Sequence, residues 1–265
     1  MSSQLILPQN IEKLISGQVP EANNVGYSGA SVYVLDDMVL KIEKISENND
    51  ATVEVMKWLE GKIPVPKVIC CEKDSEYQYL LMSKMQGKMS CDRYYMERPE
   101  FLYRTLADAM KMLWTVDVST CPRDMNPDAE LKEAKRRVEN GLVDMEMTEP
   151  STFGEGGFKD PEELLEWLIN HKPDFEPVLS HGDFCLPNLF IDGDNFSGFI
   201  DLGSTGTADK WKDIALCYRS LKHNAEGFYS ERTYPWINPD KLFDELGIEP
   251  DFNKIRYYIL LDELF

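Results

Sequence analysis

Short apolar runs separated by polar turn residues dominate the first third of the chain. Runs that are rich in Val, Ile, Leu and Tyr and bounded by turn-forming residues predict β-strands. The predicted strands are Ser31–Leu35, Val39–Ile42, Val68–Cys71 and Tyr79–Met82. Asp36 and Asp37, between the first two runs, predict a tight hairpin turn.

One helix interrupts these strands. The segment Ala51–Glu60 predicts it, because Asp50 can act as its N-cap and Gly61 can end it. The two prolines in Ile63–Pro66 then favour extended chain that leads into the next strand.

The pattern changes to helices after Gly87. A proline in the first turn marks a helix start, and a glycine marks a helix end. These signals predict helices that begin near Pro99, Pro127, Pro161 and Pro239. The segment Leu179–Gly203 instead predicts a loop and a hairpin, with strands Asn188–Ile191 and Ser197–Ile200.

The order of these elements indicates an α+β fold with two lobes. A length of 265 residues suits one large domain or two unequal lobes. We expect residues 1–82 to form a small β-rich N-terminal lobe and residues 83–88 a hinge. Residues 89–265 should form a larger, mainly helical C-terminal lobe.

The charge balance narrows the class of partner. The chain carries 47 acidic and 28 basic residues, a formal net charge of −19. Binding to nucleic acid relies on Lys and Arg that displace counterions, so we expect no nucleic-acid partner. An acidic surface attracts cations, although it can equally serve only to keep the protein in solution.

The cysteine spacing and the length of the apolar runs indicate in which cellular compartment the protein works. The six cysteines show no CxxC spacing, and the three histidines lie in no HExxH pattern, so we expect no zinc site. We find no signal peptide and no apolar run that approaches the length of a membrane helix. We therefore expect a cytoplasmic protein with reduced thiols and no membrane partner.

The strongest chemical signal lies in His181–Asn188 and in the following Phe199–Gly203. Asp183 is followed by Asn188, and Asp201 comes directly after an apolar strand. In protein kinases this order places an Asp that accepts the proton of the substrate hydroxyl, with an Asn and a second Asp that hold Mg²⁺. Either motif alone is common by chance, and polar residues that cap a hairpin would explain it. The two together, in this order, predict phosphoryl transfer.

Two upstream features have weaker signals. Lys41 lies within an apolar strand, where it is either the lysine that contacts nucleotide phosphates or an edge lysine that points to solvent. The small-residue segment Gly26–Ala30 is either a phosphate-binding loop or a plain hairpin. No GxxxxGK[ST] motif occurs, which argues against a P-loop enzyme.

These motifs resemble those of the aminoglycoside 3′-phosphotransferases, antibiotic-resistance kinases with a protein-kinase-like two-lobe fold. The segments that carry the resemblance are Trp58–Val68, Ser180–Asn188, Ser197–Asp213 and Tyr257–Phe265. The resemblance implies a Mg²⁺-dependent enzyme that transfers the γ-phosphate of ATP or GTP to the 3′-hydroxyl of a cationic aminoglycoside and confers resistance. We expect a monomer or a weak dimer.

The resemblance assigns a role to each residue of the nucleotide site. Asp183 matches the catalytic base, and Asn188 and Asp201 match the Mg²⁺ ligands. Lys41 matches the phosphate-contacting lysine. The remaining matches are Ser28 near the β-phosphate, Ser83 and Met85 on the hinge, and Asp213 and His181, which support the catalytic loop.

The resemblance also assigns acidic residues to the aminoglycoside. Glu149 and Glu155 lie in a loop, residues 144–157, that matches one closing over the drug; a solvated acidic surface is the alternative. Asp262, Glu263 and the carboxylate of Phe265 match the acidic end of the same site.

Some positions depart from the family pattern. The helix glutamate that should pair with Lys41 is replaced by Thr52. The nearest acids are Glu54 and Asp50, of which we favour Glu54 as the partner of Lys41. Ser204, His223 and Asn224 differ from relatives and leave the substrate range open. A kinase of the same fold for another small hydroxylated molecule is the alternative function, and an inactive binding module is the third.

Overall fold

The computed structural model describes residues 7–18, 21–23 and 30–265. The chain divides into two compact units. Unit 1 comprises Met1–Gly87 with Phe190–Gly203, and unit 2 comprises Lys88–Leu189 with Ser204–Phe265. The segment Phe190–Gly203 thus belongs to unit 1, whereas the sequence placed it in the C-terminal lobe.

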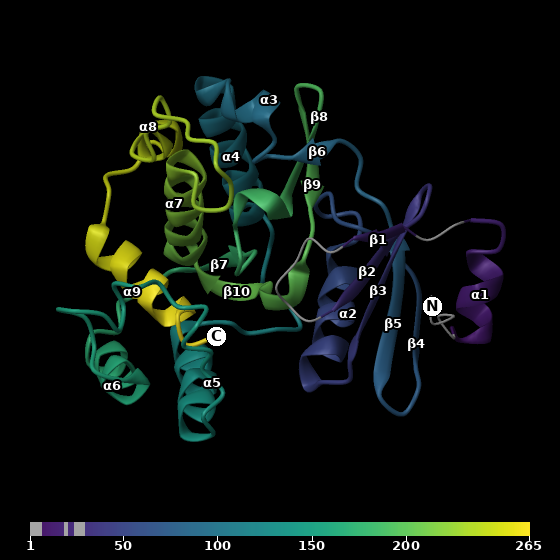
Figure 1. Cartoon of the computed structure of the whole chain (residues 1–265), viewed down its shortest axis with the longest axis horizontal. Helices are drawn as coiled ribbons and strands as arrows, with labels where there is room; N and C mark the ends of the chain where they lie inside the picture. The colour runs from purple at the N-terminus through teal and green to yellow at the C-terminus, as the bar shows by residue number, and fades with distance from the viewer. Residues whose placement is uncertain (1–6, 19–20, 24–29) are drawn as a thin grey trace. The chain divides into compact units, whose positions relative to one another are not determined.

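Unit 1 is built on a five-stranded antiparallel sheet of order β1-β2-β3-β5-β4 (Figure 1). Its strands are β1 (Glu21–Asn23), β2 (Ser31–Val34), β3 (Met38–Lys44), β4 (Val68–Lys73) and β5 (Tyr77–Ser83). The four predicted strands are confirmed as β2 to β5. The predicted turn is confirmed too, because the Leu35 N–H donates to the Met38 carbonyl at 2.9 Å.

Alternation along β3 gives its two faces different roles. Met38, Leu40 and Ile42 are buried in a cluster that includes Ile11 of α1 (Gln9–Leu14). Successive side chains of a strand point to opposite faces. Lys41 and Glu43 therefore share the opposite, half-buried face.

Helix α2 (Glu47–Leu59) starts earlier than predicted. Ser46 is its N-cap, and the Ser46 N–H donates to Asn49 Oδ1 at 2.5 Å. Asp50, the predicted N-cap, lies inside the helix and pairs with Lys73 at 2.6 Å. The early start follows from the Ser46–Asn49 pair, which satisfies a free N–H at the helix start.

The remainder of unit 1 is mainly the hairpin of β8 (Leu189–Asp192) and β9 (Asn195–Phe199). Both strands match the prediction to within two residues. The Phe199 N–H donates to the Pro64 carbonyl at 3.0 Å. Gly198 has φ +153°, and a Cβ there would lie 2.5 Å from the Pro64 oxygen, so this approach requires glycine.

Unit 2 is mainly helical. Its helices are α3 (Arg93–Met96), α4 (Pro99–Trp114), α5 (Pro127–Glu139), α6 (Pro161–Asn170), α7 (Lys210–Glu226), α8 (Lys241–Leu246) and α9 (Phe252–Asp262). Its strands are β6 (Lys88–Met89), β7 (Pro177–Ser180) and β10 (Gly206–Asp209), of which β7 and β10 pair antiparallel. Helix α7 packs on α9, α4 on α8 and α5 on α6.

Proline at the first position explains why three of the predicted helix starts are confirmed, and side-chain caps support two of them. Pro99, Pro127 and Pro161 are the first residues of α4, α5 and α6. Asn126 accepts the N–H groups of two residues of α5, and Asp160 accepts that of Glu163. Helix α8 instead starts at Lys241, beyond the predicted Pro239.

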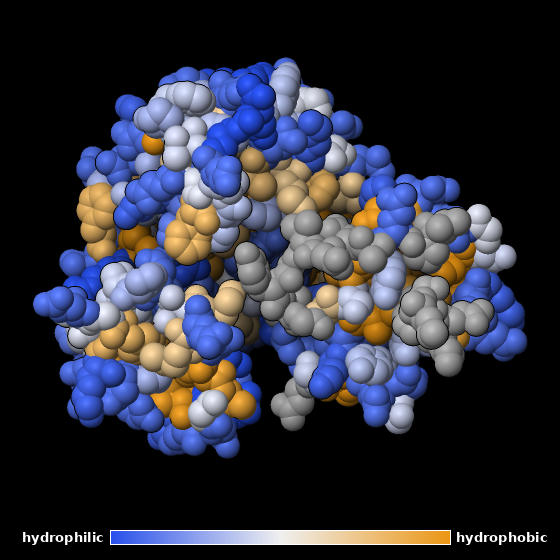
Figure 2. Space-filling view, viewed as in Figure 1, coloured by the Kyte–Doolittle hydropathy of each residue, from blue (hydrophilic) through white to orange (hydrophobic). Residues whose placement is uncertain are grey.

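The surface is mostly hydrophilic on the face that Figure 2 shows. Hydrophobic residues form separate patches there. Across residues 7–18, 21–23 and 30–265, no helix is both long and apolar enough to span a membrane.

Candidate active site

In unit 1, Lys41 pairs with two carboxylates. Its Nζ lies 3.1 Å from Glu43 Oε2 and 3.6 Å from Asp201 Oδ1. Burial opposes the charge of Lys41, but the carboxylates of Asp201 and Glu43 outweigh it and raise the pKa of Lys41. Lys41 therefore stays cationic, and the alternative of a solvent-pointing edge lysine is wrong, because β3 lies between β2 and β5.

The predicted pairing of Lys41 with Glu54 is wrong. Glu54 is exposed on α2, whereas its neighbours Val53 and Val55 are buried. A position between inward-facing residues of a helix turns away from the side that packs. Glu43 takes the expected place because residues i and i+2 of a strand lie on one face.

Asp201 lies just after β9 in an unusual backbone conformation. Its φ is +55°, and it is the one non-glycine residue with positive φ in the described part of the chain. Asp tolerates this region better than most residues, but the conformation still costs of order 1–3 kcal/mol. The adjacent loop is held because Asn48 Nδ2 donates to the Gly203 carbonyl at 3.2 Å. In this conformation the half-exposed carboxylate of Asp201 lies near the Lys41 ammonium group.

In unit 2, Asp183 and Asn188 are brought together as predicted. Asn188 Nδ2 donates to Asp183 Oδ2 at 2.8 Å and to the Asp183 carbonyl at 3.0 Å. The amide nitrogen of Asn188 is thereby used, and its oxygen is left as a possible metal ligand. Asn188 ends a short 3₁₀ turn, Leu186–Asn188, which directly precedes β8, and Asp183 lies in the loop before this turn.

Buried Asp213 braces this loop, as predicted. Its carboxylate accepts from Ser180 Oγ, the His181 N–H and the Gly182 N–H, each at 2.9 Å. Burial raises the pKa of Asp213, while His181 and the three hydrogen bonds oppose that rise. His181 is fully buried, and its Nδ1 lies 3.3 Å from the Asp183 N–H. His181 therefore supports the loop.

Gly182 is required by a close approach within unit 2. Its φ is +81°, and a Cβ at this position would lie 2.0 Å from the Ser204 carbonyl oxygen. Any side chain here would displace the backbone directly before Asp183.

Of the three other residues predicted to bind the nucleotide, the structure describes Ser83 and Met85. Ser28 lies outside the described residues. Ser83 ends β5, where its N–H donates to the Lys67 carbonyl at 2.9 Å and its Oγ accepts from the Lys67 N–H at 2.8 Å. Met85 follows, half-buried, in irregular chain.

The predicted acidic site of unit 2 is organised by Arg219, a residue that sequence reasoning missed. Arg219 pairs with Asp262, with Glu263 at 3.2 Å and with Glu149 at 4.0 Å. Burial opposes its charge, but the carboxylates outweigh it and raise the pKa of Arg219. The available signal was a lone arginine among the apolar residues of α7.

His223 was expected only as a departure, and it joins the same cluster. Its Nε2 lies 3.3 Å from Glu149 Oε1, and its ring stacks on Phe228 at 4.5 Å. The neighbouring His223 lowers the pKa of Glu149 most strongly, with Arg219 adding to the effect against burial. Arg219 and the His223 ring thus both lie against the carboxylates of the acidic site.

The other predicted acceptor residues differ in their surroundings. Phe265 is held by Arg137, which donates to the Phe265 oxygen at 2.5 Å and to the Leu264 carbonyl at 2.7 Å. Glu155 is exposed in the loop. The Glu149 N–H donates to Glu263 Oε2 at 2.6 Å, which ties this loop to the residue that directly follows α9.

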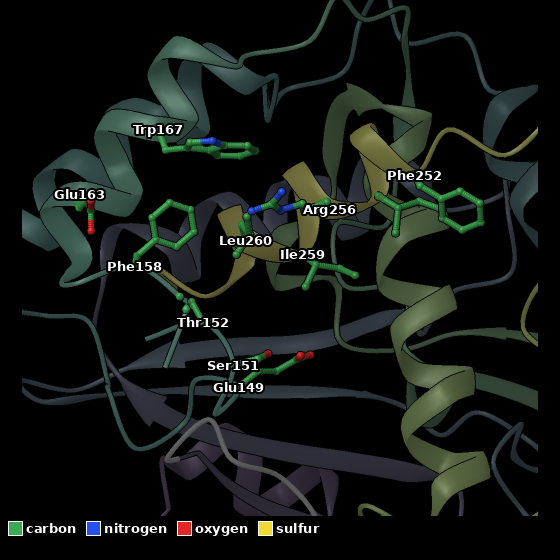
Figure 3. A pocket seen from close by; sticks show the side chains of 13 residues that line it. Glu149, Ser151, Thr152, Phe158, Glu163, Trp167, Phe252, Arg256, Ile259 and Leu260 are labelled. Carbon is green, nitrogen blue, oxygen red and sulfur yellow. The ribbon is translucent and has the colours of Figure 1, made fainter. Parts of the chain in front are cut away.

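A cavity of about 580 Å³ lies in unit 2 next to this loop. Figure 3 shows Trp167 of α6 and Arg256 of α9 directed toward one another, with Phe158 below them. The guanidinium of Arg256 lies 5.2 Å from the centre of the Trp167 ring. The cavity adjoins the predicted acceptor residues through Glu149.

The oxygen ligands that each unit offers by itself suit Mg²⁺. Among the described residues, no three His, Cys, Asp or Glu side chains gather as a metal site. Mg²⁺ keeps several waters and binds through one or two carboxylates together with substrate phosphates. The Asn188 amide oxygen and the half-exposed Asp201 carboxylate are ligands of that kind.

Comparison with known proteins gives consistent results. Residues 20–233 match the family described as "Phosphotransferase enzyme family". The chain is similar to an aminoglycoside 3′-phosphotransferase of Enterococcus faecalis, with 39% identity over 100% of both chains.

Two solved structures share the fold. An aminoglycoside 3′-phosphotransferase of type VIII aligns with a TM-score of 0.78 and 29% identity, over 93% of this chain and 94% of that one. An aminoglycoside phosphotransferase of Streptomyces rimosus, in complex with ADP and streptomycin, aligns with a TM-score of 0.73 and 24% identity. It covers 96% of this chain and 97% of that one.

Proposed function

Because the chain belongs to the phosphotransferase enzyme family, we propose that it transfers the γ-phosphoryl group of ATP or GTP to the 3′-hydroxyl of an aminoglycoside. Relatives that are 30–39% identical to this chain, over nearly the whole length of both chains, are named aminoglycoside 3′-phosphotransferases. The observation that carries the proposal for this chain is the Asp183–Asn188 pair on a loop braced by buried Asp213.

Asp183 is the proposed general base. Its carboxylate orients the acceptor hydroxyl and takes its proton as the oxygen bonds to the γ-phosphorus and the bond to the nucleotide breaks. The hydrogen bond from Asn188 fixes the direction of this carboxylate. General-base catalysis of this kind contributes roughly 10²–10⁴-fold.

Lys41, Asn188 and Asp201 form the proposed phosphate side. Lys41 contacts the α- and β-phosphates, while Asn188 and Asp201 hold Mg²⁺. When bound, Mg²⁺ neutralises charge on the phosphates. Ser28 near the β-phosphate, and Ser83 and Met85 beside the base, complete the proposed nucleotide site.

The proposed acceptor site consists of Asp262, Glu263, Glu149, Glu155 and the end of the chain at Phe265. Aminoglycosides carry several ammonium groups, which carboxylates bind well. Arg219 lies among three of these carboxylates and sets their spacing. We also propose that the enzyme works in the cytoplasm, where nucleoside triphosphates are supplied. It would act as a monomer or a weak dimer.

Nucleotide turnover with matched acceptors tests this function. Purified protein is assayed with Mg²⁺ and either ATP or GTP, against kanamycin and against tobramycin, which lacks the 3′-hydroxyl. We expect turnover with kanamycin and none with tobramycin. Equal turnover of both would contradict the 3′ position, and no turnover across a wider aminoglycoside panel would contradict the substrate class.

A second candidate acceptor is a less cationic hydroxylated molecule. Arg219 and His223 occupy carboxylates that an ammonium group would otherwise use. If aminoglycosides fail as acceptors, other antibiotics and amino alcohols in the same assay separate this candidate from an inactive binding module.

A further inference from the structure

The face of β3 that carries Lys41 supplies its own carboxylate. Lys41 and Glu43 are 18% and 19% exposed, and their charged atoms lie 3.1 Å apart. Val32 and Leu80 are paired with Lys41 on the two neighbouring strands, and neither carries a charge. The ion pair of Lys41 therefore runs along its own strand.

Helix α2 offers Lys41 no partner among the acids whose side chains the structure describes. Asp50 pairs with Lys73, and Glu54 is exposed. At Thr52 the helix has a short buried side chain, whose Oγ1 donates to the Asn48 carbonyl at 2.8 Å. Among the described side chains of α2, none therefore supplies the carboxylate that protein kinases take from this helix.

Asp201 is the other carboxylate near Lys41, but the proposed function gives it a second task. A carboxylate that binds Mg²⁺ shares its charge with the metal ion, which weakens its hold on a lysine. Glu43 has no such competitor in the described part of the chain, because Lys41 is its ion-pair partner there. Glu43 is therefore the partner that stays with Lys41 when nucleotide and metal bind.

We propose that Glu43 is the positioning residue for Lys41, replacing the helix glutamate of protein kinases by a residue of the same strand. The inference rests on the proposed function, since it assigns Lys41 to the nucleotide phosphates. Glu43 acts through Lys41 by restricting the rotamers of its long side chain. Two residues on one strand face have a nearly fixed separation, so the pair is formed before nucleotide arrives.

A double-mutant cycle on nucleotide affinity tests the proposal. The dissociation constant of a non-hydrolysable ATP analogue with Mg²⁺ is measured by titration calorimetry for wild type, Lys41→Met, Glu43→Gln and the double variant, without acceptor. We expect Glu43→Gln to weaken binding about tenfold, as for loss of a charge-assisted contact. In the Lys41→Met background the same change should have an effect below about twofold, because its partner is gone.

Two further variants separate positioning from folding. Glu54→Gln is the matched control on α2, and we expect it to bind the analogue as wild type does. Glu43→Asp keeps the charge and should recover part of the affinity lost in Glu43→Gln. Thermal unfolding of each variant shows whether lost affinity follows lost stability, which a purely structural role requires.

The outcomes distinguish this inference from the proposed function. Additive effects in the cycle, tighter binding by Glu43→Gln, or an equal loss in Glu54→Gln would each overturn the role of Glu43. If wild type binds the analogue but phosphorylates no aminoglycoside, the acceptor assignment fails while the cycle still decides on Glu43. If wild type binds no nucleotide, both proposals are refuted.

Discussion

At the scale of single residues, the reaction depends on where a few carboxylates are held. Asp183, Asp201 and Asp213 lie within one stretch of sequence, yet their environments differ. Asp213 is fully buried and accepts three hydrogen bonds, whereas the Asp201 side chain is 46% exposed. Asp183 accepts from Asn188 and stays within reach of solvent. Asp183 and Asp201 are the two that the proposed function assigns to substrate and metal.

Asp183→Asn should separate chemistry from binding. The amide keeps the shape of the side chain but cannot take the hydroxyl proton, so kcat should fall by at least about 10²-fold. Affinity for nucleotide with Mg²⁺ should stay within about twofold, because the role of Asp183 is on the acceptor side. Steady-state kinetics and titration calorimetry measure the two quantities; a variant that kept a tenth of wild-type kcat would show that another group is the base.

At the scale of elements, local signals in the sequence predicted the fold well. Proline starts predicted α4, α5 and α6, with side-chain caps at the last two, and short apolar runs predicted β2 to β5. These signals act between residues that are close in the sequence, so a single sequence is enough to predict the elements that they define. The prediction of Asp50 as the N-cap of α2 was wrong, because the Ser46–Asn49 pair lies upstream of it and starts the helix there.

Partners far apart in the sequence could not be predicted in this way. Helix α9 lacks a proline start, and the ion pairs of Arg219 join α7 to residues more than forty positions away. The pairing of Lys41 with Glu54 was wrong because the family pattern expects a helix acid, while the strand itself provides Glu43. Side-chain direction on a helix decided that case, and sequence spacing alone does not give it.

Arg219→Met should destabilise unit 2. Glu263 is buried, and burial raises its pKa despite the Glu149 N–H and Arg219, so removing the arginine leaves a costly charge. Breaking such a pair costs about 3 kcal/mol of unfolding free energy. The matched control is Arg136→Met, which breaks an exposed pair with Glu133 and should cost less than about 1 kcal/mol.

The pH dependence of the same variant has a definite sign. A carboxyl whose folded-state pKa lies above its unfolded value contributes stability below the unfolded pKa and loses it as pH rises through the folded pKa. The cost of Arg219→Met should therefore shrink as pH falls, because Glu263 takes up a proton and its buried charge disappears. Denaturant unfolding at neutral and mildly acidic pH measures this; a cost that grew on acidification would show that the arginine does not offset Glu263.

At the scale of the whole molecule, net charge should act on the acceptor. A chain of formal net charge −19 attracts cations over distances that salt screens. Raising ionic strength from about 0.05 to about 0.5 M should increase KM for kanamycin several-fold while kcat changes little. Kinetics at fixed Mg²⁺ with added NaCl measure this, and a KM that is independent of salt would indicate that only local contacts bind the drug.

The arrangement of Lys41 and Glu43 has a consequence for control. Many protein kinases are switched off by moving a helix, which separates its glutamate from the phosphate-binding lysine. Here both partners belong to β3, so no helix movement can part them. An enzyme built in this way has no off position of that kind. Its lysine would be in position to bind phosphates whenever nucleotide is present. Inhibitors that work by displacing a helix would not separate Lys41 from Glu43.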